Sequence, residues 1–103
     1  MHIVVLTTSG SKEEAQKICQ GILQDRLAAC VNIIEGVSSY FWWEGKIDTA
    51  KENLLVIKTR KALLNKLIKK IRTLHSYDVP EIISLPIAAG SKKYLEWIDE
   101  STS

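Results

Sequence analysis

The stretch Tyr40–Lys46, which reads YFWWEGK, holds four of the chain's seven aromatic side chains, followed by a pair of residues typical of a tight turn. Glu44-Gly45 predicts a hairpin turn, because glycine readily adopts the positive φ that such turns need. The aromatic run therefore predicts one strand of a hairpin that returns over residues 52–59. Successive side chains of a strand point to opposite faces, so both faces of this strand are apolar. One small core can cover only one of them.

Hydrophobic spacing on both sides of the hairpin predicts the remaining elements. Ser11 with Glu14 three residues later indicates a capping box that starts a helix at about residue 12. Pro86 has no backbone N–H for a ladder and puts the last strand at an edge. The predicted strands are 3–6, 29–34 with a continuation towards 43, 52–59 and 81–87. The predicted helices are one from about 12, one over 61–74, and a short one that Ser91 caps.

The resulting order, β-α-β-β-α-β plus a helix, predicts a single α+β domain over residues 1–103 with a ferredoxin-like sandwich. In such a sheet one face meets water, and its strands alternate apolar and polar residues. Residues 3–6 and 54–57 would be central strands, yet they are apolar on both faces. The aromatic strand repeats this feature. We therefore expect a second copy of the chain to cover the open face, because the last helix can cover only part of it.

Composition excludes several classes of function. The net charge is only +2, which does not indicate nucleic acid or an acidic membrane surface as a partner. No apolar run has the roughly 18 residues of a membrane span, and residues 1–6 do not resemble a signal peptide. Two cysteines without repeat spacing fit a reducing cytoplasm. The strand 52–59 also lacks the stacking aromatics of RNA-recognition modules.

The candidate site residues are polar side chains near the ends of elements that are otherwise apolar. His75 follows a helix, where it could bind a ligand or only interact favourably with the helix C-terminus. Lys58 could meet an anion or simply extend to solvent from a strand end. Cys30 could be a ligand at a site between subunits or a small buried hydrophobe. The expected ligand-binding cluster, placed between subunits, combines Cys30, Asn32, Lys58, Tyr77 and Glu81 with His75.

Metal and anion binding are the two competing functions. His2, His75, Cys19 and Cys30 are the borderline or soft ligands, too few for a closed tetrahedral site in one chain. We expect no tightly bound metal, but weak copper binding that depends on His75, since imidazole suits copper(II). The alternative is an anion sensor in which Lys58 and the loop 7–11 hold the ligand. No paired nucleophile and base is visible, so we expect no catalysis.

Five segments in register resemble the CutA family of divalent-cation tolerance proteins. They are Leu27–Asn32, Tyr40–Lys46, Ile57–Thr59, His75–Ile82 and Tyr94–Ile98. The resemblance implies a tight trimer with sheets inward, like the PII signalling proteins, a link to copper and other divalent metals, and no established enzymatic activity. Because the hairpin is apolar on both faces, we expect the trimer interface to include Tyr40, Phe41, Trp42 and Trp43. The chain departs from some family members at three positions, which hold Thr7, Leu74 and Ser76.

Overall fold

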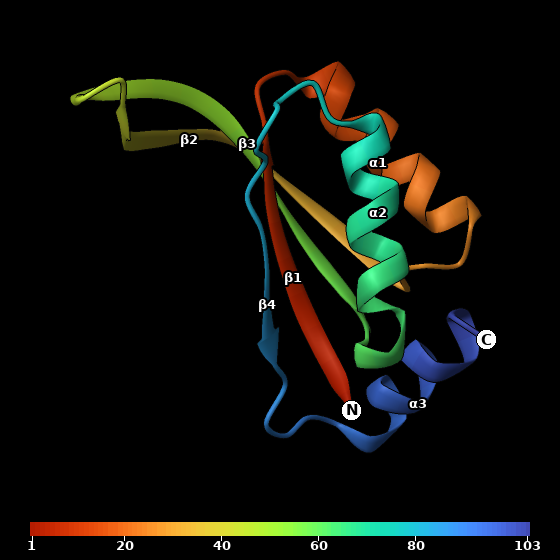
Figure 1. Ribbon diagram of the computed structural model, residues 1–103. Helices are drawn as coiled ribbons and strands as arrows, with labels where there is room; N and C mark the ends of the chain where they lie inside the picture. Colours follow the sequence, from red (N-terminus) through yellow and green to blue (C-terminus); the bar gives the residue numbers. More distant parts are fainter.

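The computed structural model describes residues 1–103 and contains one four-stranded antiparallel sheet flanked by helices (Figure 1). The elements are β1 (His2–Ser9), α1 (Lys12–Gln24), β2 (Cys30–Trp43), β3 (Lys46–Arg60), the 3₁₀ turn η1 (Lys61–Leu63), α2 (Leu64–Leu74), β4 (Ile82–Pro86) and α3 (Lys92–Ser101). This is the predicted β-α-β-β-α-β order followed by a helix. The α+β, ferredoxin-like fold class is therefore confirmed.

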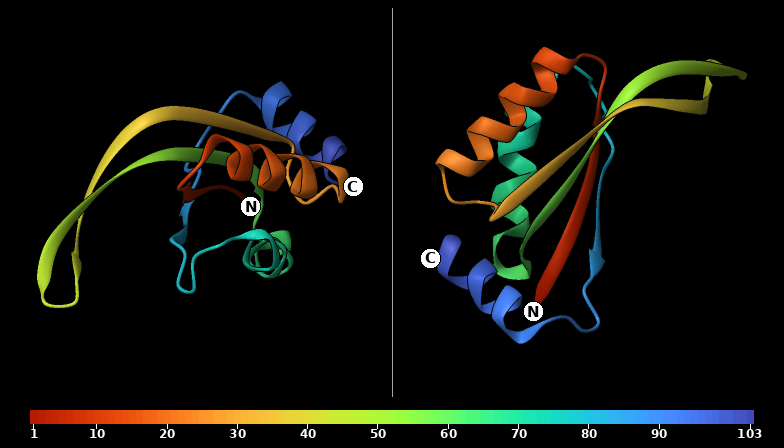
Figure 2. Two further views of the ribbon diagram at one scale, coloured as in Figure 1. Left: turned by 90° about the horizontal axis from the view of Figure 1, so that it is seen from above. Right: turned by 180° about the vertical axis from the view of Figure 1, so that it is seen from behind.

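One face of the sheet is closed by α1 and α2, which lie side by side across it (Figures 1 and 2). The strand order is β2-β3-β1-β4, so β1 and β3 are the central strands and β4 with Pro86 lies at an edge. Val5, Leu55 and Ile57 point to the helices and are fully buried. They form the core with the apolar stripes of the two helices, which include Ala15, Ile18, Ile22, Leu67 and Ile71.

The opposite, open face of the sheet is also apolar, but neither α1 nor α2 covers it. Leu6 is paired with Ile83, and Val4 with Leu85. Cross-strand partners share a face, so these four side chains lie together on the open face. Ile83 and Leu85 are 50% and 46% exposed. Helix α3 lies near the N-terminal end of β1 and reaches only that end of the open face, where Tyr94 lies at Cys30 (Figure 1).

Beyond the helices, β2 and β3 continue as a two-stranded arm, which we define as residues 37–52 (Figures 1 and 2). The pairing of β1 with β3 stops at Asn53, so the arm has no third strand. A bulge between Ile34 and Val37 marks its base, where Gly36 has a φ of 71°. At its tip Glu44 and Gly45 have φ values of 49° and 77°, which confirms the hairpin turn.

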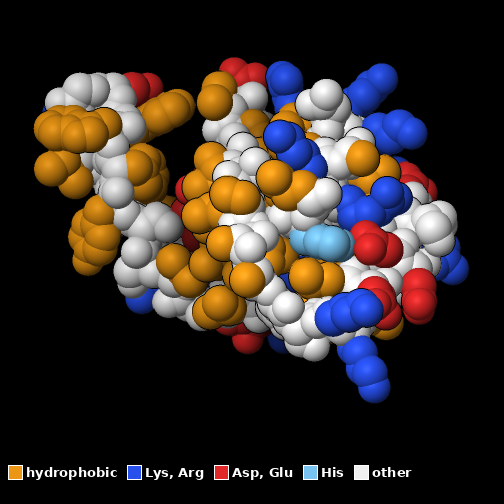
Figure 3. Space-filling view, turned by 90° about the horizontal axis from the view of Figure 1, so that it is seen from below, with side chains coloured by type: hydrophobic (Ala, Val, Ile, Leu, Met, Phe, Trp, Pro, Cys, Tyr) orange, Lys and Arg blue, Asp and Glu red, His pale blue; other side chains and the backbone are white.

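The predicted interface residues lie near the tip of this arm. Tyr40, Trp42 and Trp43 are 73%, 74% and 61% exposed, and Phe41 is 39% exposed. Figure 3 shows hydrophobic side chains gathered on the projecting arm, apart from those on the body of the molecule. Within one chain, Tyr40, Trp42 and Trp43 are mostly uncovered, and Phe41 is only partly covered. Their role as a trimer interface stays a prediction.

Three element boundaries differ from the sequence prediction. β1 extends to Ser9, three residues past the predicted end of the first strand. β3 begins at Lys46 and not at residue 52, because the polar segment 46–51 pairs with the aromatic strand although it lacks apolar alternation. The helix predicted over 61–74 begins with the 3₁₀ turn η1 and becomes α-helical at Leu64. No side chain caps either start, which fits a first turn with tighter 3₁₀ bonding.

Candidate functional site

His75, directly after α2, is held by two backbone groups. Its Nε2 lies 2.6 Å from the carbonyl oxygen of Thr8, and its Nδ1 accepts a 3.0 Å hydrogen bond from the N–H of Tyr77. A carbonyl oxygen can only accept, so these partners assign the proton to Nε2 and make the ring neutral. The side chain is fully buried. A metal ion could reach a ring nitrogen only if His75 left one of these partners.

Glu14 ties the start of α1 to the segment after α2. Its carboxylate accepts hydrogen bonds of 3.1 Å from the Ser9 hydroxyl and from the N–H of Ser76. It also lies 3.5 Å from Nδ1 of His75. Partial burial raises the pKa of Glu14, but the hydrogen bonds from Ser76 and Ser9 outweigh it. The resulting pKa lies below the ordinary value of 4.5.

The predicted capping box is therefore only half formed. The Ser11 hydroxyl accepts a 3.1 Å hydrogen bond from the N–H of Glu14, as expected for an N-cap. The Glu14 carboxylate, however, bonds Ser9 and Ser76 in place of the Ser11 N–H. The pattern located the helix start correctly, but it gave the carboxylate the wrong partner.

Tyr77 extends this polar group to the base of the arm. Its hydroxyl donates a 2.8 Å hydrogen bond to Oε2 of Glu52, and its ring lies 4.7 Å from the His75 ring. Partial burial, the hydrogen bond to Glu52 and the negative charges of Glu52 and Glu14 together raise the pKa of Tyr77 to about 12. The phenol therefore remains a protonated donor at neutral pH.

Cys30, Asn32 and Lys58 meet at the other end of the sheet, on the open face. Cys30 opens β2 opposite Lys58, and the Lys58 ammonium donates a hydrogen bond to the Asn32 side-chain oxygen. Tyr94 from α3 belongs to the same group: partial burial raises its pKa, and so do the charge of Cys30 and a hydrogen bond with it. Partial burial also raises the pKa of the Cys19 thiol, with a smaller effect from Cys30.

Within one chain these two groups are separate. Lys58 is paired with Val4 of β1, whereas His75 contacts Thr8, four residues further along the same strand. At about 3.3 Å per residue, this offset is about 13 Å. Glu81 is exposed just before β4 and joins neither group. A single site that combines all six predicted residues thus requires a second copy, and it stays a prediction.

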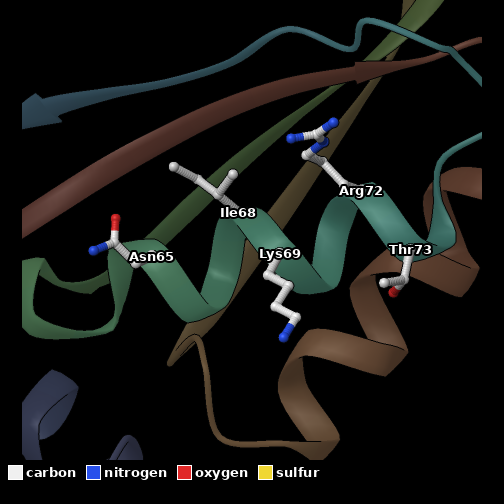
Figure 4. Close-up of a pocket in the computed structure, with 5 residues that line it drawn as sticks. All are labelled: Asn65, Ile68, Lys69, Arg72 and Thr73. Carbon is white, nitrogen blue, oxygen red and sulfur yellow. The ribbon is translucent and has the colours of Figure 1, made fainter.

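No other part of the chain offers a more convincing ligand site. No three His, Cys, Asp or Glu side chains lie close enough together to hold a metal ion. A shallow hollow runs along the outer face of α2 (Figure 4). Its lining comes from one helix and includes none of the predicted site residues: Asn65, Ile68, Lys69, Arg72 and Thr73.

Sequence reasoning missed three members of the polar group around His75, namely Ser9, Glu14 as a partner of Ser76, and Glu52. The capping-box pattern singled out Glu14, but only as part of a helix start. Glu52 is 25 residues from Tyr77 in sequence. No local pattern connects these two residues.

Comparison with known proteins assigns the chain to a family. The family model for the "CutA1 divalent ion tolerance protein" matches residues 3–101. The chain belongs to the CutA1 family. The resemblance found in the sequence is thereby confirmed, and the match includes both polar groups and the whole arm.

Relatives in the CutA1 family come from distant organisms. The chain is 50% identical over 100 residues to "Protein CutA 1, chloroplastic" of Oryza sativa, covering 97% of this chain but 56% of that protein. It is 44% identical over 102 residues to the "Divalent-cation tolerance protein CutA" of Thermus thermophilus, covering 99% of each. The chain thus spans just over half of the plant relative and nearly all of the bacterial one.

Solved CutA1 structures have the same fold. The protein from Thermus thermophilus superposes with a TM-score of 0.98 at 44% identity, and CutA from Archaeoglobus fulgidus with 0.97 at 42%. Both matches cover 100% of each chain. Since the identity is also substantial, the likeness supports the CutA1 assignment as well as the fold.

The family model and the Thermus relative are named for divalent-cation tolerance and not for an enzymatic activity. The names of the relatives do not agree on a compartment: the rice protein is called chloroplastic, and the Archaeoglobus structure is called periplasmic. The predicted cytoplasmic location is therefore not confirmed. No helix of this CutA1 chain has the length and apolar character needed to cross a membrane.

Proposed function

We propose that this CutA1 chain forms a homotrimer that contributes to divalent-cation tolerance without catalysing a reaction. The observation that carries this proposal is the pair of uncovered apolar surfaces, the open face of the sheet and the aromatic arm. Ile83 on the open face is half exposed, and Trp42 on the arm is 74% exposed. Monomers in solution rarely expose apolar surfaces of this extent, and such surfaces mark interfaces.

The shape of the chain allows the copies to close into a ring. The arm projects from one side of the molecule, and the open face lies on the body (Figures 1 and 3). An arm of one copy placed against the body of the next makes a head-to-tail contact, which closes into a ring when the rotation allows it. The likeness to CutA1 proteins supports three as the number of copies.

Sedimentation equilibrium at several micromolar concentrations tests the assembly. We expect one species with three times the mass of a chain of 11.6 kDa. A monomer at these concentrations would refute the trimer, whereas a dimer would refute the ring but not the burial of the apolar surfaces.

For the metal, we propose weak copper binding with no resident structural ion. Support for His75 as the ligand comes from the imidazole chemistry alone, because its two ring nitrogens already have backbone partners. His2 is the other imidazole, and its Nε2 lies 2.9 Å from a carboxylate oxygen of Asp99. Copper titration of the wild type, His75→Ala and His2→Ala separates the two. Affinity lost only in His75→Ala supports the proposal, and affinity unchanged in that variant removes His75 as a ligand.

A PII-like anion sensor is the second candidate, supported by the lysine on the open face. Lys58 is engaged by Asn32, and the Glu14 carboxylate lies against Ser9 where an anion at the α1 N-terminus would bind. Both contacts argue against an anion shared between Lys58 and the loop 7–11 of one chain. A thermal-shift screen with divalent metals and with nucleotides tests this: stabilisation by nucleotides alone would favour the sensor.

A further inference from the structure

The arm has one side-chain hydrogen bond to the rest of the chain. Among the described residues 1–103, the other side-chain hydrogen bonds of the arm are internal, from Lys51 to Ser38 and within residues 48–49. The exception is the 2.8 Å bond from the Tyr77 hydroxyl to Glu52. Apart from the two strands themselves, this contact is the polar connection between the arm and the body.

The connection lies at the point where the arm could change direction. Glu52 is paired with Val37, the first pair beyond the bulge, and Gly36 in that bulge has a φ of 71°. A bulge bends a strand and alters its twist, and glycine permits a wider range of backbone angles than other residues. A bond placed at this pair therefore acts on the angle between arm and sheet.

Glu52 depends on this hydrogen bond. Its side chain is nearly buried, with 8% of the residue exposed, although it carries a carboxylate. No Lys, Arg or His of the chain lies within ion-pair distance of it, and Tyr77 is its side-chain hydrogen-bond donor. A buried acceptor that loses its donor is costly, so the bond resists breaking.

The other end of the connection is fixed to the body of the molecule. The Tyr77 N–H is bound to His75, whose ring is bound to the carbonyl of Thr8 in β1. A Cβ atom at Gly10 would lie 3.1 Å from the Tyr77 hydroxyl, so the glycine leaves room for the phenol to reach Glu52. The segment after α2 thus holds the phenol in place against the end of β1.

We propose that Tyr77 and Glu52 form a latch that sets the direction in which the arm leaves the sheet. With the bond in place, the bulge is held in one geometry and the aromatic tip occupies one position relative to the open face. Without it, the arm pivots at Gly36. The latch itself does not depend on assembly, but its consequence, a pre-positioned arm for the neighbouring copy, rests on the proposed trimer.

Hydrogen–deuterium exchange of the arm tests the latch through three variants. Tyr77→Phe removes one hydroxyl and keeps the ring that packs against His75. Glu52→Gln removes the charge but retains a side-chain oxygen that accepts from the phenol. Tyr94→Phe is the matched control, because it removes a tyrosine hydroxyl from α3, away from the arm. Circular dichroism and sedimentation of each variant establish that it is folded and report its assembly.

In Tyr77→Phe we expect amides of residues 37–52 to exchange faster by on the order of tenfold, since a hydrogen bond to a charged group is lost. Glu52→Gln should show a smaller change, and Tyr94→Phe none in this segment. Wild-type exchange of the arm in Tyr77→Phe would overturn the latch, and so would a uniform acceleration over the whole chain. A monomeric wild type would refute the trimer instead, while the comparison of arm exchange would still decide on the latch.

Discussion

The two faces of the sheet are built from the same strands and similar side chains, yet only one is covered. Leu55 and Ile57 point towards α1 and α2 and are fully buried, whereas Ile34 and Ile83 on the opposite face are half exposed. A sheet with one wet face normally alternates apolar and polar residues. The core of one chain therefore does not explain all of its apolar residues, and a second covering surface is needed to explain the rest.

The largest expected effect concerns the arm. In the trimer, Trp42→Ala should weaken association by about 3–5 kcal/mol, the usual cost of truncating a buried tryptophan. In an isolated chain the same side chain is 74% exposed, so its loss would change the free energy of unfolding of that chain very little. Sedimentation over a dilution series measures the change. If the Trp42→Ala trimer dissociated at the same concentration as the wild type, Trp42 would not be buried between copies.

Leu55→Ala is the matched change on the closed face. Leu55 is fully buried inside one chain, so its truncation should lower the free energy of unfolding by about 2–5 kcal/mol. Its effect on association should be smaller than that of Trp42→Ala, because the side chain faces the helices. Denaturant titration and sedimentation of both variants, side by side, separate folding of the chain from assembly.

Replacement of Glu14 should have a smaller effect on the free energy of unfolding, and this effect should depend on pH. The pKa of Glu14 in the folded chain lies below its ordinary value of 4.5. The charged carboxylate therefore stabilises the fold above that value, and the contribution is lost as the pH falls through the lower folded pKa. We expect wild type to be more stable than Glu14→Gln at neutral pH, with the difference shrinking below about pH 4.5.

Denaturation curves between neutral and acidic pH check this prediction, with Glu13→Gln as the control. Glu13 is the exposed neighbour of Glu14 in the same first turn of α1. A difference for Glu14→Gln that stays constant with pH, or one equal to that of Glu13→Gln, would contradict the role of the hydrogen bonds from Ser9 and Ser76.

The smallest expected effect comes from a pair of threonines on the closed face. The Thr7 hydroxyl is buried without a hydrogen-bond partner, whereas the Thr59 hydroxyl donates a 2.7 Å bond to the carbonyl of Leu27. Thr7→Val should therefore stabilise the fold by about 1 kcal/mol, and Thr59→Val should destabilise it by about 1–3 kcal/mol. Thermal unfolding should show the midpoint temperature raised in Thr7→Val and lowered in Thr59→Val, each relative to the wild type.

The fold followed from the sequence because its signals are local. Glu44-Gly45 marked the hairpin turn, Ser11 marked the start of α1, and apolar runs marked the central strands. The site followed only in part. Hydrogen bonds such as Glu14 to Ser76 and Tyr77 to Glu52 join residues 62 and 25 positions apart, and no pattern within one element encodes them.

The contacts of His75 could not be predicted for the same reason. Its place after a helix left open whether it binds a ligand or only interacts with the helix C-terminus. Only the three-dimensional arrangement shows the two backbone groups that occupy its nitrogens. The separation of Lys58 from His75 likewise depends on the register of β3 against β1, which the apolar pattern of the strands does not specify.

Coverage of the arm by a neighbouring copy can be measured through the fluorescence of Trp42. The chain has three tryptophans, so the double variant Trp43→Phe/Trp97→Phe leaves Trp42 as the only one. Acrylamide quenching is then measured from micromolar concentrations down to dilutions at which the trimer dissociates. We expect a protected Trp42 in the assembled protein that becomes accessible on dilution. A Trp42 that is quenched as readily as free tryptophan in the assembled protein would show that no neighbouring copy covers the arm.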